Sequence, residues 1–418
     1  MSYTVSEKKS ETLSRLLSIP EVATGFDFIE TDQETSIAEQ IELTLVEAPT
    51  FQEQARAELL RSKFEALGLA DVCIDRGGNV VGKLKGCGNG PTVLVEGHMD
   101  TVFPLGTVKT VDEKDGFLYA PGIGDDTRAL AIMLSTIRAI QNAGVRHTGD
   151  IIFMGTSREE GMGSLGGMKD FLEDHKGQID ASISIDSSDF PEITYEGTGF
   201  RTYEVNFYGI GGHAYYAFGT MANPLHAAAR AVAKISDFQV SEYPRTTFCV
   251  SNFHAGNDAG IHAIVPKATI KFNFRSNSSE LLQELDDRIF RAIQEACDEE
   301  TARWGKDTIT WDSKIVCDVP AGTQDEHAPI VESVYAVIEH LGVTPKLVRG
   351  GCTNCNVAID KGIPAICISH TYSPDGIPAN IHSVDEKFPI AGAFKAVQET
   401  YLMALLCSGV EGIDTILK

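Results

Sequence analysis

The feature that most constrains the fold is the alternation of short apolar runs with longer amphipathic stretches through the first half of the chain. The stretch 125–144 repeats its apolar residues at helical spacing, opens with two aspartates and closes at Gly144. Runs typical of buried strands lie on either side of it, at 80–84, 92–95, 151–154 and 181–185. This alternation predicts an α/β fold in which helices flank a mostly parallel sheet.

The pattern changes near Gly199. Segments 201–209 and 267–276 alternate apolar and polar residues, as half-exposed strands do. Segment 224–238 has a proline in its first turn and is typical of a helix, and 278–304 is typical of a long charged helix. We therefore predict an α+β module in which two helices lie on an antiparallel sheet.

The pattern after this module resembles that of the first half. Segment 356–369 again has the character of a buried strand, and a last helix is expected to begin near Val384. The simplest organisation is one catalytic domain formed by residues 1–198 and 315–418, interrupted by an inserted domain at 199–314.

Composition limits the class of partner. The 418 residues carry a formal net charge of −24, and such a surface repels phosphate backbones, so we expect no nucleic-acid partner. The first 20 residues lack the apolar core of a secretory signal, and no later run reaches the ~18 apolar residues needed to span a bilayer. The nine cysteines form no disulfide framework, as in proteins whose thiols stay reduced. We predict a cytoplasmic protein that acts on a small molecule or short peptide, with no membrane partner.

Side chains with metal-binding atoms follow several of the predicted strands or stand at the starts of helices. They are His98, Asp100, Asp125, Asp126, Glu159, Glu160, Asp186 and His382. In open α/β sheets, ligands bind beyond the carboxyl ends of the strands, where such residues converge. We therefore expect these side chains to gather at one edge of the sheet.

Carboxylates that crowd together repel one another and need a cation at neutral pH. A mixture of imidazole and carboxylate ligands suits Zn²⁺, Mn²⁺ or Co²⁺, whereas Ca²⁺ and Mg²⁺ prefer oxygen alone. We predict one or two divalent transition metal ions per chain, with zinc favoured; two ions would lie ~3.5–4 Å apart around a shared aspartate. In this arrangement His98 binds metal and Asp100 holds its other ring nitrogen. Taken alone, the two residues would fit a buried structural His–Asp pair.

Six motifs together resemble a known family. In chain order they are GHMDTV at 97–102, GIGDD at 122–126, SREEG at 157–161, SIDSSD at 184–189, GIGGHAYY at 209–216 and NIHSVDE at 380–386. The sequence is similar to the co-catalytic metallopeptidases that include peptidase T, glutamate carboxypeptidase, aminoacylase, acetylornithine deacetylase and succinyl-diaminopimelate desuccinylase. The resemblance implies an aminopeptidase-like catalytic domain with an inserted lid and dimerisation domain, and therefore a homodimer or a higher homo-oligomer.

The resemblance also implies roles for single residues. Glu159 would be the general base that takes a proton from the attacking water and passes it to the leaving amine. Five residues would be metal ligands: Asp125 as the bridge, His98 and Asp186 at one site, and Glu160 and His382 at the other. Asp100 would support catalysis beside them.

Four further residues would contact the substrate or the transition state. His213 would reach the partner subunit and stabilise the tetrahedral oxyanion. Arg275 would grip a substrate carboxylate with its guanidinium fork. His262 stands where an asparagine is common. Asn354, in the segment CTNCN at 352–356, replaces a carboxylate in a part of the chain that lines the substrate pocket in the family.

The leading hypothesis is a metal-dependent hydrolase that cleaves a peptide or amide C–N bond in a small substrate. Asp186, where other branches have glutamate, favours an aminopeptidase or dipeptidase. Alternatives are a deacylase of N-acyl amino acids, a hydrolase of a non-peptide amide or aromatic amine, and an inactive binding protein with the same fold. Cys352 and Cys355 have C-x-x-C spacing, which here predicts packing or pocket lining rather than redox chemistry.

Overall fold

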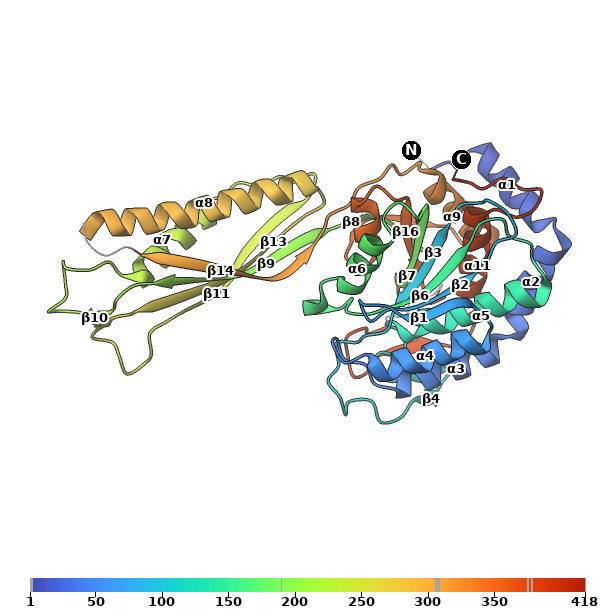
Figure 1. The fold of residues 1–418 in the computed structure, drawn as a ribbon, viewed down its shortest axis with the longest axis horizontal. Coiled ribbons are helices and arrows are strands. Elements are labelled where there is room, and N and C mark those ends of the chain that lie inside the picture. The colour runs from blue at the N-terminus through green and yellow to red at the C-terminus, as the bar shows by residue number, and fades with distance from the viewer. Residues whose placement is uncertain (1–2, 189, 305–308, 374–375, 377–378, 418) are drawn as a thin grey trace. The chain divides into compact units, whose positions relative to one another are not determined.

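A computed structural model describes residues 3–188, 190–304, 309–373, 376 and 379–417. The chain divides into two compact units, each drawn in Figure 1. The first unit is formed by Met1–Gly197 and Thr323–Lys418, and the second by Thr198–Gly322. Within the described part of the chain, no helix is both long and apolar enough to span a bilayer.

An eight-stranded mixed sheet forms the centre of the first unit. Its middle strands β6, β3, β7 and β16 are parallel, as are β8 and β15, whereas β1, β2 and β6 pair antiparallel, as do β16 and β8. The predicted α/β class is therefore confirmed, with antiparallel pairing added around the parallel centre. In spatial order the strands are β1 (Ala70–Ile74), β2 (Val80–Leu84), β6 (Ile151–Thr156), β3 (Val93–His98), β7 (Ala181–Ser187), β16 (Ala365–Ser369), β8 (Glu192–Gly197) and β15 (Lys346–Gly351).

Helices pack against this sheet and against one another (Figure 1). They are α1 (Glu7–Leu17), α2 (Pro20–Thr31), α3 (Gln33–Leu45), α4 (Gln54–Ala66), α5 (Thr127–Ala143), α6 (Gly166–Asp174), α9 (Pro329–His340), α10 (Cys355–Asp360) and α11 (Phe394–Ser408), with a 3-10 turn at Gly161–Gly163. Helix α5 is buried along nearly its whole length because it lies between β3 and the helices α2, α3 and α11. It ends at Gly144, whose left-handed backbone (φ 68°) stops the helix.

Two sequence predictions in the last hundred residues need correction. The final helix begins at Phe394, not near Val384, because the intervening chain forms β17 (Lys387–Pro389). This strand joins a small sheet with β5 (Phe117–Tyr119) and β4 (Asp112–Lys114), and buries Phe388 opposite Leu118. In addition, the apolar run expected to be one strand at 356–369 is the helix α10 followed by the strand β16.

The second unit has the predicted architecture of two helices on an antiparallel sheet. Helices α7 (Pro224–Ser236) and α8 (Ser279–Trp304) pack against β13 and against each other. The sheet has the order β11 (Thr246–Ala255), β13 (Lys267–Ser276), β9 (Gly199–Tyr208) and β14 (Thr310–Val319), and a separate short pair joins β10 (Gly212–His213) to β12 (Ala263–Ile264). The unit extends to Gly322, past residue 314, because β14 pairs with β9 as far as Val319.

Candidate metal centre

The candidate site starts where the buried strand β3 ends at His98. The preceding residue must be small, because a Cβ on Gly97 would lie 2.3 Å from the Cβ of Ala129 in α5. This close approach brings the start of α5, with its two aspartates, over the end of β3. The Oδ2 atom of Asp126 accepts a hydrogen bond of 2.8 Å from the His98 backbone N–H and fixes the contact.

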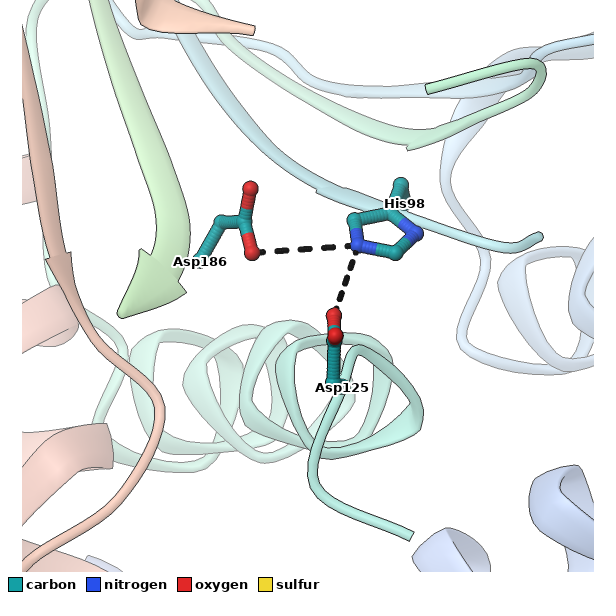
Figure 2. A group of neighbouring side chains, drawn as sticks. All are labelled: His98, Asp125 and Asp186. Atoms are coloured by element: carbon teal, nitrogen blue, oxygen red, sulfur yellow. Dashed lines mark hydrogen bonds and ion pairs between the residues drawn. The ribbon is translucent and has the colours of Figure 1, made fainter. Parts of the chain in front are cut away.

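His98 contacts two carboxylates that come from different elements (Figure 2). Its Nε2 atom lies 3.0 Å from Oδ1 of Asp125, which precedes α5, and 3.7 Å from Oδ1 of Asp186 on β7. The other ring nitrogen, Nδ1, lies 2.9 Å from the backbone carbonyl oxygen of Asp100. An Nδ1–H that donates to this carbonyl leaves the Nε2 lone pair facing the carboxylates, as a metal ligand requires.

A second group shares Asp125 with the first. The Nε2 atom of His382 lies 3.0 Å from Oδ2 of Asp125 and 2.7 Å from Oε1 of Glu160. Each of the two triads has donor atoms within 4.8 Å of one another, and so does the set of His98, Glu159 and Glu160. Residues from five separate segments of the chain, the predicted ligands and Glu159, therefore meet at one place.

Asp100 holds the two glutamates. Its buried carboxylate accepts hydrogen bonds from the backbone N–H groups of Glu159 (2.9 Å) and Glu160 (3.0 Å), and from the hydroxyl of Thr50 (2.9 Å). The expected contact between this carboxylate and His98 Nδ1 is longer, at 3.7 Å, because the Asp100 carbonyl takes the shorter one. Asp100 thus supports His98 through its main chain and the glutamates through its side chain.

Comparison with known proteins shows the family to which the chain belongs. The pattern of Peptidase family M20/M25/M40 matches residues 94–406. The chain belongs to this family. Membership confirms the resemblance found in the motifs and identifies the protein as a metallohydrolase that acts on peptide or amide bonds.

Proteins similar to this chain differ in the activity for which they are named. A succinyl-diaminopimelate desuccinylase from Methylobacillus flagellatus is 28% identical over 371 residues, covering 83% of this chain and 92% of the relative. The aminopeptidase PepT from Bacillus cereus has a similar structure (TM-score 0.73, 24% identity, 89% of this chain and 97% of that one). So does Bacillus subtilis YXEP, described as a dinuclear metal-binding M20 peptidase (TM-score 0.66, 15% identity, 90% and 98%). The family and the fold are thereby shown, and the substrate is left open.

Glu386 supports the metal centre, and the sequence motifs did not single it out. Its buried carboxylate accepts backbone N–H bonds from Gly122 (2.9 Å), Gly124 (2.8 Å) and Asp125 (2.9 Å). It reaches this loop because β17, which follows it, pairs with β5 directly before the loop. Glu386 therefore ties the His382 segment to the segment of the shared aspartate.

The charges of the site are unbalanced. Burial and the nearby carboxylates raise the pKa of Asp186 to about 7 and the pKa of Glu159 well above its usual range. Hydrogen bonds to Asp125 and Glu160 raise the pKa of His382 to about 10. For His98, burial disfavours the charged form, but contacts with Asp125 and Asp186 outweigh it and raise its pKa. A site that retains protons in this way has too little positive charge of its own, and a divalent cation would supply it.

Asn354 is buried against β3, the strand that ends at His98. It precedes α10, is 2% exposed, and its amide donates a 2.8 Å hydrogen bond to Oε2 of Glu96 on β3. The Thr156 hydroxyl donates to the same oxygen at 2.7 Å. Within the first unit Asn354 therefore contacts the strand that ends at His98. Cys355 is buried beside it, as packing predicts, and Cys352 is exposed.

The other predicted substrate residues belong to the second unit. His213 and His262 line the same cavity of 480 Å³, with Ile210, Ile264 and Pro266. The Nδ1 atom of His213 accepts a 3.2 Å hydrogen bond from the Tyr215 backbone N–H. Arg275 is on the sheet face opposite the buried residues of β13, exposed, with its guanidinium 4.7 Å from the centre of the Phe200 ring.

Proposed function

We propose that this protein hydrolyses a peptide bond or a related amide in a small substrate, as an aminopeptidase or dipeptidase, with two divalent metal ions. The observation that carries the proposal is the position of Asp125, which presents one carboxylate oxygen to His98 and the other to His382, each at 3.0 Å. A carboxylate shared in this way suits two adjacent metal ions. The proposed ligands are Asp125, His98 and Asp186 for one ion and Asp125, Glu160 and His382 for the other, with zinc favoured over manganese or cobalt.

When bound, the metal ions would polarise the scissile carbonyl and acidify the attacking water. Glu159 is the proposed general base. It is buried, its backbone is held by Asp100, and burial raises its pKa, so that it binds a proton more tightly than an exposed glutamate does. In this mechanism Glu159 takes the proton of the attacking water and donates it to the leaving nitrogen.

The second unit is proposed to be a lid and dimerisation domain of a homodimer or a higher homo-oligomer. The Tyr215 N–H occupies Nδ1 of His213, which leaves Nε2–H free to donate to an oxyanion, in the partner subunit's site. The exposed side chains of Tyr215, Tyr216 and Ile261 supply apolar surface for an interface. Arg275 is proposed to bind a substrate carboxylate, and His262 to act beside His213.

A deacylase of N-acyl amino acids is the second candidate, because the relative from Methylobacillus flagellatus is a desuccinylase. A hydrolase of non-peptide amides or aromatic amines is the third, since the replacement at Asn354 changes the polar groups behind the site.

A substrate panel tests the proposal. The purified protein, stripped with a chelator and reloaded with Zn²⁺, Mn²⁺ or Co²⁺, is incubated with dipeptides, tripeptides, N-acyl amino acids and aromatic amides. We expect metal-dependent hydrolysis of dipeptides or tripeptides. Hydrolysis of N-acyl amino acids alone would favour the deacylase, and no hydrolysis of any amide by metal-loaded protein would refute the proposed function.

A further inference from the structure

The described part of the first unit exposes seven large apolar side chains, and five of them adjoin metal-centre residues along the chain or through one hydrogen-bonded neighbour. These five are between 42% and 65% accessible: Phe51, Val102, Met162, Ile381 and Val384. We call them the apolar rim; the other two are Leu45 and Leu105. Exposed apolar side chains at a polar site can serve to bind an apolar group of a ligand.

Three rim residues lie within two positions of Glu160 or His382, two members of the second metal triad. Met162 comes two positions after Glu160, in the 3-10 turn Gly161–Gly163. Ile381 precedes His382, and Val384 comes two positions after it. Since His382 Nε2 lies 2.7 Å from Glu160 Oε1, these two segments are in contact through their site residues.

Two more rim residues are tied to Asp100. Val102 follows it by two positions. Phe51 follows Thr50, whose hydroxyl donates to the Asp100 carboxylate at 2.9 Å and whose N–H donates to the carbonyl oxygen of Thr101 at 3.3 Å. The same Asp100 carboxylate holds the backbone of Glu159. Val102 and Phe51 are therefore both connected to Asp100, the residue that positions the general base.

Phe51 has an unusual backbone for a bulky residue. Its φ of 71° is left-handed, a region that aromatic side chains rarely adopt. The conformation is held by Glu53, whose Oε1 accepts 3.0 Å hydrogen bonds from the N–H groups of Phe51 and Arg158. Phe51 is 59% exposed, and strained backbone of this kind often occurs at functional positions.

The charged group next to the site is already engaged. Arg158 adjoins Glu159, but one of its guanidinium nitrogens donates to Asp170 at 2.6 Å and to the Gly77 carbonyl at 2.9 Å. In the first unit, an acidic substrate group near Glu159 would therefore find this cation held elsewhere. An uncharged apolar group would be desolvated against the rim.

From these observations we infer that the apolar rim binds an aliphatic or aromatic group next to the scissile amide, so that the enzyme prefers apolar substrates to acidic ones. This inference rests on the proposed function, since it concerns the substrate of the same site.

The test compares paired substrates and exposed variants. The pairs are Leu-Gly with Glu-Gly, Gly-Leu with Gly-Glu, and N-acetyl-leucine with N-succinyl-leucine, and kcat/KM is measured for each with metal-loaded protein. We expect the apolar member of at least one pair to be favoured at least tenfold, the order of discrimination that an apolar contact gives. The variant Met162→Gln, Val384→Gln should lower this ratio about tenfold, mostly through KM, and leave the metal content unchanged.

Leu45→Gln is the matched control, because Leu45 is 47% exposed in the same unit but lies at the end of α3, outside the apolar rim. It should leave every ratio unchanged. Preference for the acidic members, or equal loss of the ratio in the control, would overturn the inference while hydrolysis itself upheld the proposed function. Failure to hydrolyse any pair would instead be a failure of the proposed function. In that case calorimetry with the variant Glu159→Gln still measures whether leucine binds more tightly than glutamate. Equal or weaker binding of leucine would overturn the inference.

Discussion

Substitution of Glu386 by glutamine tests a residue that supports the metal centre without being a predicted metal ligand. The Glu386 carboxylate accepts three backbone N–H bonds from the loop that carries Asp125. In the glutamine one oxygen becomes an NH₂ group, which cannot accept a hydrogen bond. At least one of the three N–H groups is left without its acceptor, and all three lose the negative charge.

The size of the effect follows from these bonds. A buried donor without a partner costs about 1–3 kcal/mol, and a hydrogen bond to a charged group contributes about 1.5–3 kcal/mol. We therefore expect Glu386→Gln to lower the free energy of unfolding by about 2–4 kcal/mol. Because the loop positions the shared aspartate, metal affinity should fall about 10- to 100-fold, as is typical when a residue that supports a ligand is changed.

Glu47→Gln is the matched control. The Glu47 carboxylate also accepts backbone N–H bonds, from Gly106 and Val108 at 2.7 Å each, but its loop carries no predicted ligand. Metal affinity is measured by competition with a coloured chelator, and amide hydrogen exchange is followed at Gly124 and Asp125. Unchanged metal affinity in Glu386→Gln, or an equal loss in the control, would refute the reasoning.

Three other predictions follow from single residues. Glu159→Gln should lower kcat by at least about 100-fold and leave metal content near that of the parent, and parallel loss of metal in an elemental assay would mean that Glu159 is a ligand. His213→Ala should reduce kcat more than thermal stability, and mixing it with Glu159→Gln should restore part of the activity if His213 acts in the partner subunit; no recovery in mixed dimers would contradict that role. Glu399 is buried in α11, where neither carboxylate oxygen has a hydrogen-bond partner among the described residues, and burial alone raises its pKa well above the usual range. Since the folded form binds the proton more tightly than the unfolded form (pKa about 4.3), stability falls as pH rises from that value to the raised pKa of the folded form, and changes no further above it. Relative to the parent, Glu399→Gln should therefore gain up to about 1.4 kcal/mol per pH unit within that window, and a pH-independent difference in urea denaturation across it would contradict this.

Much of the site could be predicted because it depends on strand ends. The apolar run before His98 predicts a buried strand, and the rule that ligands bind at the carboxyl edge then groups it with Asp186 and Glu160. For His98, Asp186 and Glu160 this grouping depends only on where each strand ends. These residues lie close together although they are far apart in the chain.

The parts that were missed depend on contacts with no local signal. Glu386 reaches the Asp125 loop through the pairing of two three-residue strands, which are too short to stand out as a pattern. The helix α10 was predicted as part of a strand, because a six-residue apolar helix cannot be told from a strand by periodicity. The last helix was expected to begin near Val384, and this was wrong because the three-residue strand β17 has no recognisable pattern in the sequence.

Anomalous diffraction at the zinc edge, from crystals of the zinc-loaded protein, tests the central claim most directly. The account predicts two peaks about 3.5–4 Å apart, one among His98, Asp125 and Asp186 and the other among Asp125, Glu160 and His382. The absence of zinc from both positions, or zinc bound by other residues alone, would contradict it.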